Sequence, residues 1–283
     1  MQTDLSNIRC IAFDLDDTIL NENKELSERT KAVLARAAEA GIALVPVSGR
    51  SWDTFPACVR ELPGITYAVT SNGAAVYNGK TGQKVHGWLM EAKDVRAIMR
   101  SVGNFFLEGQ ITYEAFVDGA AHAAADYVTS PTRFGVPKSA VSYIQQTRRP
   151  NRYIIDFIFE NARKMDSLDL ILKEPGMYRM IENTIRRNVE NIYITSSVPY
   201  RMEISSAASG KASGLKYVLD QLELTPEQTV AFGDGDNDAP MLQFAGTGIA
   251  VKNASQSCRE SADMTLKLSN QEDGVADYLE KCL

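Results

Sequence analysis

Ile-Arg-Cys-Ile-Ala-Phe-Asp-Leu, residues 8–15, is a short and nearly continuous apolar run. A run of this length is typical of a β-strand that is buried on both faces. A helical pattern follows it, beginning after Ser27, a predicted N-cap, and ending at Gly41, where a left-handed C-terminal cap is expected. A second apolar run at 42–47 completes a strand-helix-strand unit, which predicts a parallel sheet.

The same alternation returns near the C-terminal end of the chain. The pattern there predicts helices at 212–224, 239–245 and 271–283 and strands at 229–232 and 247–251. The middle of the chain, from about residue 82 to residue 200, has a different pattern. Apolar residues alternate with polar ones more often there, and arginine is more frequent. This pattern predicts strands at 154–159 and 191–196, helices at 95–102 and 165–173, and a partly solvent-facing sheet.

We therefore expect an α/β fold, with a doubly wound parallel-sheet core and an inserted α+β domain. The core is predicted to comprise residues 1–82 and 200–283, and the insertion residues 83–199. A hairpin turn at Asn78–Gly82 lies near the first junction, and Pro199 interrupts the chain near the second.

The composition excludes several classes of protein. The 283 residues carry a formal net charge of -6, so no basic surplus exists for a general nucleic-acid binder. The 4 cysteines form no CxxC pair and the 2 histidines are isolated, which argues against a zinc site or a disulfide framework. No signal peptide or membrane span is predicted, so we expect a soluble, cytoplasmic protein with no nucleic-acid or membrane partner. The sequence does not indicate an oligomeric state.

Polar residues follow three of the predicted core strands. The first strand ends in Asp14-Leu15-Asp16-Asp17-Thr18, the second in Ser48-Gly49-Arg50, and a late strand in Gly233-Asp234-Gly235-Asp236-Asn237-Asp238. Ligands bind beyond the carboxyl ends of the strands in open α/β sheets. We therefore expect these side chains to meet in one crevice.

A cluster of Asp14, Asp234 and Asp238 is costly to bury without a cation. Oxygen-only ligands favour a hard cation such as Mg²⁺, which in turn attracts a phosphoryl group. Asp14 and Asp16, two residues apart, can reach one reacting centre. One carboxylate can attack phosphorus to form an aspartyl-phosphate, and the other can act as general acid and base. The Ser48 hydroxyl, the Gly49 backbone and the Lys211 ammonium suit phosphate oxygens.

These motifs resemble those of the haloacid dehalogenase (HAD) superfamily of phosphatases, in particular its Cof-type sugar phosphatases (subfamily IIB). Residues 14–18 match the first motif, Val47–Arg50 the second, Lys211 the third and Gly233–Asp238 the fourth; Ser71-Asn72-Gly73-Ala74 also looks like the family. The resemblance covers nearly the whole chain. One departure is Lys252, in Val251-Lys252-Asn253-Ala254, where the family often has a glycine-containing segment.

The resemblance implies a Rossmann-like core and a Mg²⁺-dependent phosphoric monoester hydrolase acting on small phosphorylated metabolites, sugar phosphates among them. It implies the following site: Asp14 as nucleophile, Asp16 as general acid/base, Ser48, Gly49, Lys211 and Asn237 on the phosphate, and Asp14, the Asp16 carbonyl, Asp234 and Asp238 on Mg²⁺. The inserted domain would set substrate specificity.

Several alternatives stay open at this point. The same aspartyl-phosphate would serve a phosphotransferase or phosphomutase, and a non-catalytic phosphate-binding sensor is a third possibility. Arg50 either contacts substrate or braces its loop. Arg148, Arg149 and Arg152 are expected on a solvated charged face.

Overall fold

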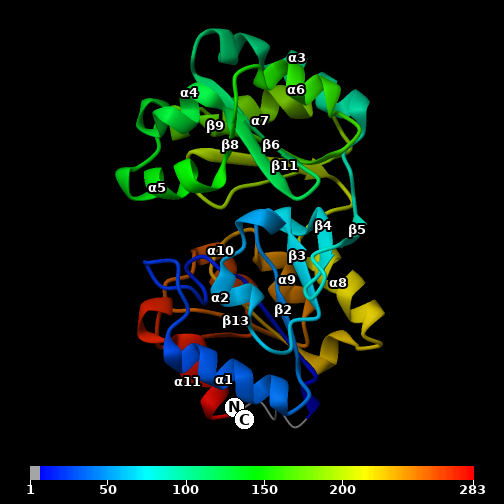
Figure 1. Ribbon diagram of the computed structural model, residues 1–283, viewed down its shortest axis with the longest axis vertical. Coiled ribbons are helices and arrows are strands. Elements are labelled where there is room, and N and C mark those ends of the chain that lie inside the picture. Colours follow the sequence, from blue (N-terminus) through cyan, green and yellow to red (C-terminus); the bar gives the residue numbers. More distant parts are fainter. Residues whose placement is uncertain (1–6) are drawn as a thin grey trace. The chain divides into compact units, whose positions relative to one another are not determined.

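A computed structural model describes residues 7–283 and divides them into two compact units. Unit 1 comprises the described residues up to Arg50, Phe55–His86 and Gly210–Leu283; unit 2 comprises Ser51–Thr54 and Gly87–Ser209 (Figure 1). Unit 1 is therefore assembled from both ends of the chain. None of the described helices is long and apolar enough to cross a membrane.

The central sheet of unit 1 has five parallel strands in the order β14-β13-β12-β1-β2. The strands are β1 (Cys10–Phe13), β2 (Ala43–Pro46), β12 (Thr229–Gly233), β13 (Thr247–Ala250) and β14 (Met264–Thr265). All four residues of β1 are buried, which is the burial expected for a strand covered on both faces. The central position of β1 places its carboxyl end beside those of β2 and β12.

Helices and a second small sheet complete unit 1. The helices are α1 (Glu28–Glu39), α2 (Ala57–Arg60), α8 (Lys211–Gln221), α9 (Ala239–Phe244), α10 (Gln256–Ser261) and α11 (Gly274–Glu280). The strands β3 (Tyr67–Thr70), β4 (Ala75–Asn78) and β5 (Lys84–Gly87) form the small sheet, with the 3₁₀ turn η3 (Ser71–Gly73) between β3 and β4. The Ser27 hydroxyl caps α1 by accepting a hydrogen bond from the Thr30 N–H at 3.0 Å, and Gly41 has φ +82°, as the sequence predicts.

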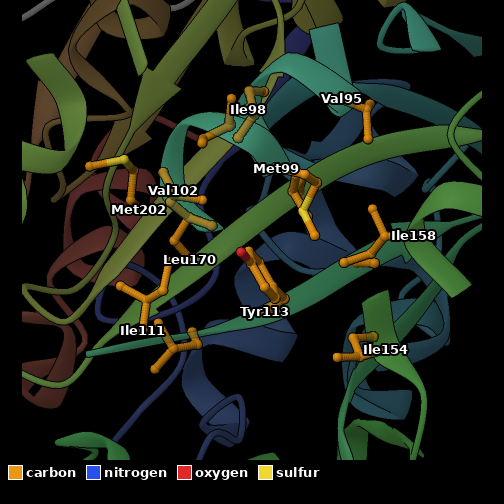
Figure 2. Packing of buried hydrophobic residues seen from close by; sticks show 14 of the residues in the cluster. Val95, Ile98, Met99, Val102, Ile111, Tyr113, Ile154, Ile158, Leu170 and Met202 are labelled. Carbon is orange, nitrogen blue, oxygen red and sulfur yellow. The ribbon is translucent and has the colours of Figure 1, made fainter. Parts of the chain in front are cut away.

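Unit 2 contains a mixed six-stranded sheet in the order β10-β11-β9-β6-β7-β8. Its strands are β6 (Ile111–Val117), β7 (Ala120–Ala124), β8 (Arg149–Asn151), β9 (Met165–Leu172), β10 (Ile192–Thr195) and β11 (Arg201–Ser206). Its helices are α3 (Ala92–Leu107), α4 (Ala125–Thr129), α5 (Lys138–Thr147), α6 (Ile154–Glu160) and α7 (Tyr178–Arg186). Figure 2 shows α3 side chains such as Ile98 and Val102 packed with Tyr113 and Leu170 of the sheet in one hydrophobic core. The predicted fold class, a parallel α/β core with an inserted α+β domain, is confirmed.

Two predicted elements of unit 2 are wrong. Residues 154–159 form helix α6, not a strand, because Ile154 and Ile158 are four residues apart and both are buried in the core. The helix predicted at 165–173 is strand β9, Met165–Leu172. A register shift in the pairing of β9 with β6 interrupts the two-residue alternation near Asp166, and this irregularity concealed the strand in the sequence.

The second junction between the units also differs from the expected residue 200. Strand β11 pairs antiparallel with β9 over Arg201–Ser205, and so it belongs to the sheet of unit 2. The chain returns to unit 1 at Gly210.

Gly73 provides a test of how tightly unit 1 is packed near the start of α8. It has φ +87°, and a Cβ there would lie 1.9 Å from the Gly210 carbonyl oxygen. Gly41 has a similar φ of +82°, but a Cβ at that position would meet no described atom within 4 Å. Gly73→Ala should therefore lower the free energy of unfolding by about 3 kcal/mol, from backbone strain plus the clash.

The matched variant Gly41→Ala keeps the strain and omits the clash, so it should lose only about 1 kcal/mol. Urea unfolding followed by circular dichroism measures both. Equal losses in the two variants would show that the approach of η3 to Gly210 does not constrain the fold.

Candidate active site

Three carboxylates gather at the carboxyl ends of β1 and β12. Asp14 follows β1 and donates its N–H to the Phe232 carbonyl at 3.0 Å, while Asp234 and Asp238 lie on the loop that follows β12. One oxygen from each of Asp14, Asp234 and Asp238 lies within 4.8 Å of the others. The structure thus brings together carboxylates from opposite ends of the chain, as the sequence predicts.

Lys211 lies among these carboxylates as the first residue of α8. Its Nζ donates to Asp14 Oδ1 at 2.6 Å and to Asp238 Oδ1 at 2.5 Å, and the side chain is only 1% exposed. Burial by itself would lower the pKa of Lys211, but the charges of Asp14 and Asp238 outweigh it and raise that pKa. The lysine is therefore held as a buried cation between two carboxylates.

One lysine does not neutralise three carboxylates. Burial, together with the charges of Asp238 and Asp234, raises the pKa of Asp14. Burial and then Asp238 raise the pKa of Asp234 to about 7. An excess of buried carboxylate oxygens of this kind fits a divalent cation, and an oxygen-only set suits Mg²⁺. The donor set is thus consistent with the metal site of the family that the motifs resemble.

The loop that follows β12 is held in place by its own side chains. Asp238 Oδ2 accepts hydrogen bonds from the Asp234 N–H at 3.1 Å and the Gly235 N–H at 2.9 Å. Thr18 Oγ1 donates to Asp234 Oδ1 at 2.8 Å, which connects this loop to the first motif. These bonds fix where Asp234 and Asp238 present their remaining oxygens.

Asp16 makes a different set of contacts from Asp14. Arg50 donates to both of its oxygens, from Nε at 2.7 Å and Nη2 at 2.8 Å, and Lys24 Nζ lies 3.1 Å from Oδ1. Burial would raise the pKa of Asp16, but the bonds and charge of Arg50, with Lys24, lower it well below its usual range. The contact that the structure shows for Arg50, with Asp16, is neither of the two roles left open for it.

The second motif lies at the end of β2, beside β1. Ser48 is buried, and its Oγ accepts a hydrogen bond from the Arg50 N–H at 3.2 Å. The Asn72 N–H donates to the Ser48 carbonyl at 3.0 Å, and Asn237 Nδ2 donates to Asn72 Oδ1 at 2.9 Å. Gly49 lies between Ser48 and Arg50, half-buried. Ser48, Asn72 and Asn237 are therefore joined into one chain of contacts.

A loop after β13 holds both acidic segments by their backbones. Asn253 Nδ2 donates to the Asp17 carbonyl at 2.7 Å, and the Ser255 N–H donates to the Asp234 carbonyl at 2.7 Å. Asp17 has φ +60°, and the hydrogen bond from Asn253 holds this unusual turn directly after Asp16. Lys252 points its ammonium at Glu272 Oε2, 3.1 Å away, so its departure from the family pattern produces a surface ion pair.

Sequence reasoning did not assign roles to several residues that contact the site. They are Thr18, Lys24, Asn72, Asn253 and Ser255. Thr18, Asn72 and Asn253 lie inside motifs that resemble the family, which was the available signal. Lys24 and Ser255 lie outside any motif, and only the fold brings them to Asp16 and to Asp236, whose Oδ1 accepts from Ser255 Oγ at 2.5 Å.

Of the three arginines expected on a solvated face, Arg149 and Arg152 are exposed and Arg148 is not. Arg148 is buried and its Nε donates to Glu114 Oε1 at 2.9 Å. Arg149 does lie at the surface, where it pairs with Asp53. The expectation was wrong for Arg148 because a carboxylate on β6 supplies the partner that makes its burial possible.

Comparison with known proteins agrees with this geometry. Residues 11–279 match the family model of the haloacid dehalogenase-like hydrolases, and the chain belongs to that family. Among relatives, it is 28% identical to phosphatase YwpJ of Bacillus subtilis, over 98% of this chain and 100% of the relative. It is 24% identical to 5-amino-6-(5-phospho-D-ribitylamino)uracil phosphatase YwtE of the same organism, over 98% of each.

A solved structure shares the fold. A haloacid dehalogenase-like hydrolase from Bacteroides thetaiotaomicron superposes with a TM-score of 0.79 at 25% identity, covering 98% of this chain and 100% of that one. Within the family, the chain is a phosphatase, that is, a phosphoric monoester hydrolase that acts on small phosphorylated metabolites. The family resemblance drawn from the motifs is confirmed.

Asn253 provides a test of how the loop after β13 supports the acidic site. Removing its amide in Asn253→Ala should release the Asp17 turn and reorient the neighbouring Asp16 carbonyl. Loss of such an outer contact typically weakens metal binding about 10- to 100-fold. Calorimetric titration of the purified protein with Mg²⁺ measures the change, with thermal unfolding recorded in parallel.

The neighbouring variant Lys252→Ala is the matched control, because it removes only the ion pair with Glu272. Its Mg²⁺ affinity should equal that of the wild type. Equal affinities in the Asn253→Ala variant and the wild type would contradict the supporting role of Asn253.

Proposed function

We propose that this phosphatase hydrolyses sugar phosphates and related polyol phosphates through an aspartyl-phosphate on Asp14. The observation that carries the proposal is the group formed by Asp14, Asp234, Asp238 and Lys211 at the ends of β1 and β12. A buried carboxylate that lies beside a lysine and further carboxylates has the surroundings of a nucleophile that works on a metal-bound anion.

The reaction would proceed in two displacements that balance in atoms and protons. An Asp14 carboxylate oxygen attacks phosphorus while the bond to the leaving oxygen breaks, and Asp16 gives that oxygen its proton. Asp16 then takes a proton from water, the water oxygen attacks phosphorus, and inorganic phosphate leaves Asp14. The contact with Arg50 favours the ionised form of Asp16, which the second displacement requires. The first displacement requires the protonated form, so this contact would have to be released for Asp16 to carry the proton that it donates.

Asp14, the Asp16 carbonyl, Asp234 and Asp238 would hold Mg²⁺. The bound cation would supply positive charge that neutralises the phosphoryl oxygens. Ser48, Gly49, Lys211 and Asn237 would bind the remaining phosphate oxygens, and the positions of Ser48 and Asn237 on one chain of contacts through Asn72 support this assignment. Arg50 would act on Asp16 and not on substrate.

The choice of substrate is assigned to the inserted domain and not to unit 1. We propose residues 83–199 as the substrate-specificity domain, with the junctions refined to those of unit 2. The name of one relative specifies a phosphorylated ribityl chain, which is a polyol phosphate. A cytoplasmic location remains a prediction.

Two other functions were open on sequence grounds. A phosphotransferase or phosphomutase would share the aspartyl-phosphate and differ in passing the phosphoryl group to a hydroxyl in place of water. A non-catalytic sensor is disfavoured because Asp14, Asp16, Lys211 and Asp234 are all present. Release of free inorganic phosphate distinguishes hydrolysis from both.

The nucleophile assignment is tested by Asp14→Asn. An amide oxygen cannot form the aspartyl-phosphate, so Mg²⁺-dependent release of phosphate from 4-nitrophenyl phosphate should fall at least about 10³-fold. Asp17→Asn is the matched control: the same substitution on an exposed neighbour, at a left-handed φ that asparagine tolerates, should keep near wild-type activity. Full activity of Asp14→Asn with an unchanged circular dichroism spectrum would refute the assignment.

A further inference from the structure

The turn η3 in unit 1 has a backbone conformation that side chains rarely adopt. Ser71 has φ +49°, Asn72 φ +52° and Gly73 φ +87°, so three consecutive residues lie in the left-handed region. Each of the two that are not glycine costs about 1 to 3 kcal/mol in backbone strain. The turn is buried, and strain of this kind persists only where surrounding contacts offset it.

The backbone of the turn holds the second motif at two carbonyl groups. The Ser71 N–H donates to the Arg50 carbonyl at 2.9 Å, and the Asn72 N–H donates to the Ser48 carbonyl at 3.0 Å. A carbonyl and the N–H that follows it point in opposite directions across a trans peptide bond. The bond from Asn72 therefore also sets the direction of the Gly49 N–H, one of the donors proposed for phosphate.

The Asn72 side chain reaches the fourth motif. Its Oδ1 accepts a hydrogen bond from Asn237 Nδ2 at 2.9 Å, and both side chains are buried. An amide nitrogen carries two N–H donors in one plane, so this bond sets where the second N–H of Asn237 points. The oxygen of the same amide lies so close to Gly235 that a Cβ there would be 2.5 Å from it. The Asn237 amide is thus held at both ends.

The turn also packs against the third motif. Gly73 lies against Gly210, which directly precedes Lys211. The three residues of η3 therefore contact the second, third and fourth motifs, although they belong to none of the four. Within this turn, Asn72 is the residue that connects to two of the proposed phosphate donors, Gly49 and Asn237.

We propose that Asn72 is a positioning residue for phosphoryl transfer, an inference that rests on the proposed function. Its Oδ1 orients the Asn237 amide toward phosphate, while its N–H holds the peptide that carries the Gly49 donor. Donors that are already aimed at the developing negative charge need no reorganisation during the reaction. Asparagine suits the position because it tolerates a left-handed backbone and carries an acceptor on a short side chain.

A double-mutant cycle between Asn72 and Asn237 tests the side-chain contact, with 4-nitrophenyl phosphate as substrate in the presence of Mg²⁺. Asn237→Ala removes the proposed donor and should lower kcat/KM about 10- to 100-fold, as expected for a hydrogen bond to an anion. Asn72→Gly should lose a similar amount, because the Asn237 amide is then no longer oriented. The double variant should lie within about twofold of Asn237→Ala, whereas independent roles would multiply the two losses.

The choice of glycine restricts the test to the side chain. Glycine adopts a left-handed φ at no steric cost, so Asn72→Gly keeps the backbone bond to the Ser48 carbonyl. Asn72→Ser takes its place if the glycine variant does not fold. A serine hydroxyl is one bond shorter than the amide and loses the contact with Asn237, and Ser71 shows that serine adopts this backbone conformation here.

Two controls separate positioning from structural damage. The Mg²⁺ affinity of Asn72→Gly, measured by calorimetric titration, should equal that of the wild type, because the hydrogen bonds of Asn72 go to the Ser48 carbonyl and Asn237 and not to the proposed metal ligands. Asn78→Gly is the matched substitution in the same small sheet. Asn78 Oδ1 accepts from the Lys80 N–H in an exposed turn, so this variant should keep the wild-type kcat/KM.

The outcomes distinguish this inference from the proposed function. Losses that multiply in the double variant, a fully active Asn72→Gly or a lowered Mg²⁺ affinity in that variant would overturn the positioning role and leave the phosphatase intact. Full activity of Asn237→Ala would remove the phosphate role of Asn237 and this inference with it. A wild type that releases no phosphate from 4-nitrophenyl phosphate would remove the proposed function and this inference together.

Discussion

The buried ammonium of Lys211 is the constraint on which the active-site half of the molecule depends. It lies between Asp14 and Asp238, and moving three such charged groups out of water costs several kcal/mol per ion unless their geometry is well matched. That requirement explains the close packing around the start of α8. Gly210, with φ +128°, and the approach of Gly73 place the first residue of the helix where its side chain can reach both carboxylates.

The same constraint organises the loops at the strand ends. Each acidic loop is tied by hydrogen bonds to a neighbour from a distant part of the sequence: Thr18 to Asp234, Arg50 to Asp16, and Asn253 to the Asp17 carbonyl. These bonds connect the ends of β1, β2, β12 and the loop after β13 into one layer. The acidic side chains of these loops repel one another, and the hydrogen-bonded backbone fixes the distances between them.

Much of unit 1 was predictable from its sequence, and the reason lies in its strands. The apolar runs at 8–15 and 42–47 are short, lie on either side of a helix with a clear N-cap at Ser27, and end directly in polar motifs, so local pattern and tertiary role agree. The elements of unit 2 were harder to predict, because the spacing of its apolar residues does not clearly distinguish strands from helices. Ile154 and Phe159 lie in an apolar run that fits either a strand or a helix, while Asp166 at an irregular register hid the alternation of β9. Its charged row of Glu114, Asp169 and Glu203 could not be recognised at all, since only strand pairing brings those residues together.

The central position of β1 has a consequence for how the chain folds during synthesis. β1 is among the first described segments to be synthesised, and β2, which pairs with one of its edges, follows soon after. The strand that pairs with its other edge, β12 (Thr229–Gly233), is synthesised much later. Until then an apolar parallel strand keeps a row of unpaired backbone groups, which is the kind of edge that recruits other chains. Unit 2 is nearly continuous in sequence, over Gly87–Ser209, and can fold in that interval. The nascent chain can thus contain a folded unit 2 while unit 1 is still incomplete. Its solubility then depends on the time between the synthesis of β1 and that of β12.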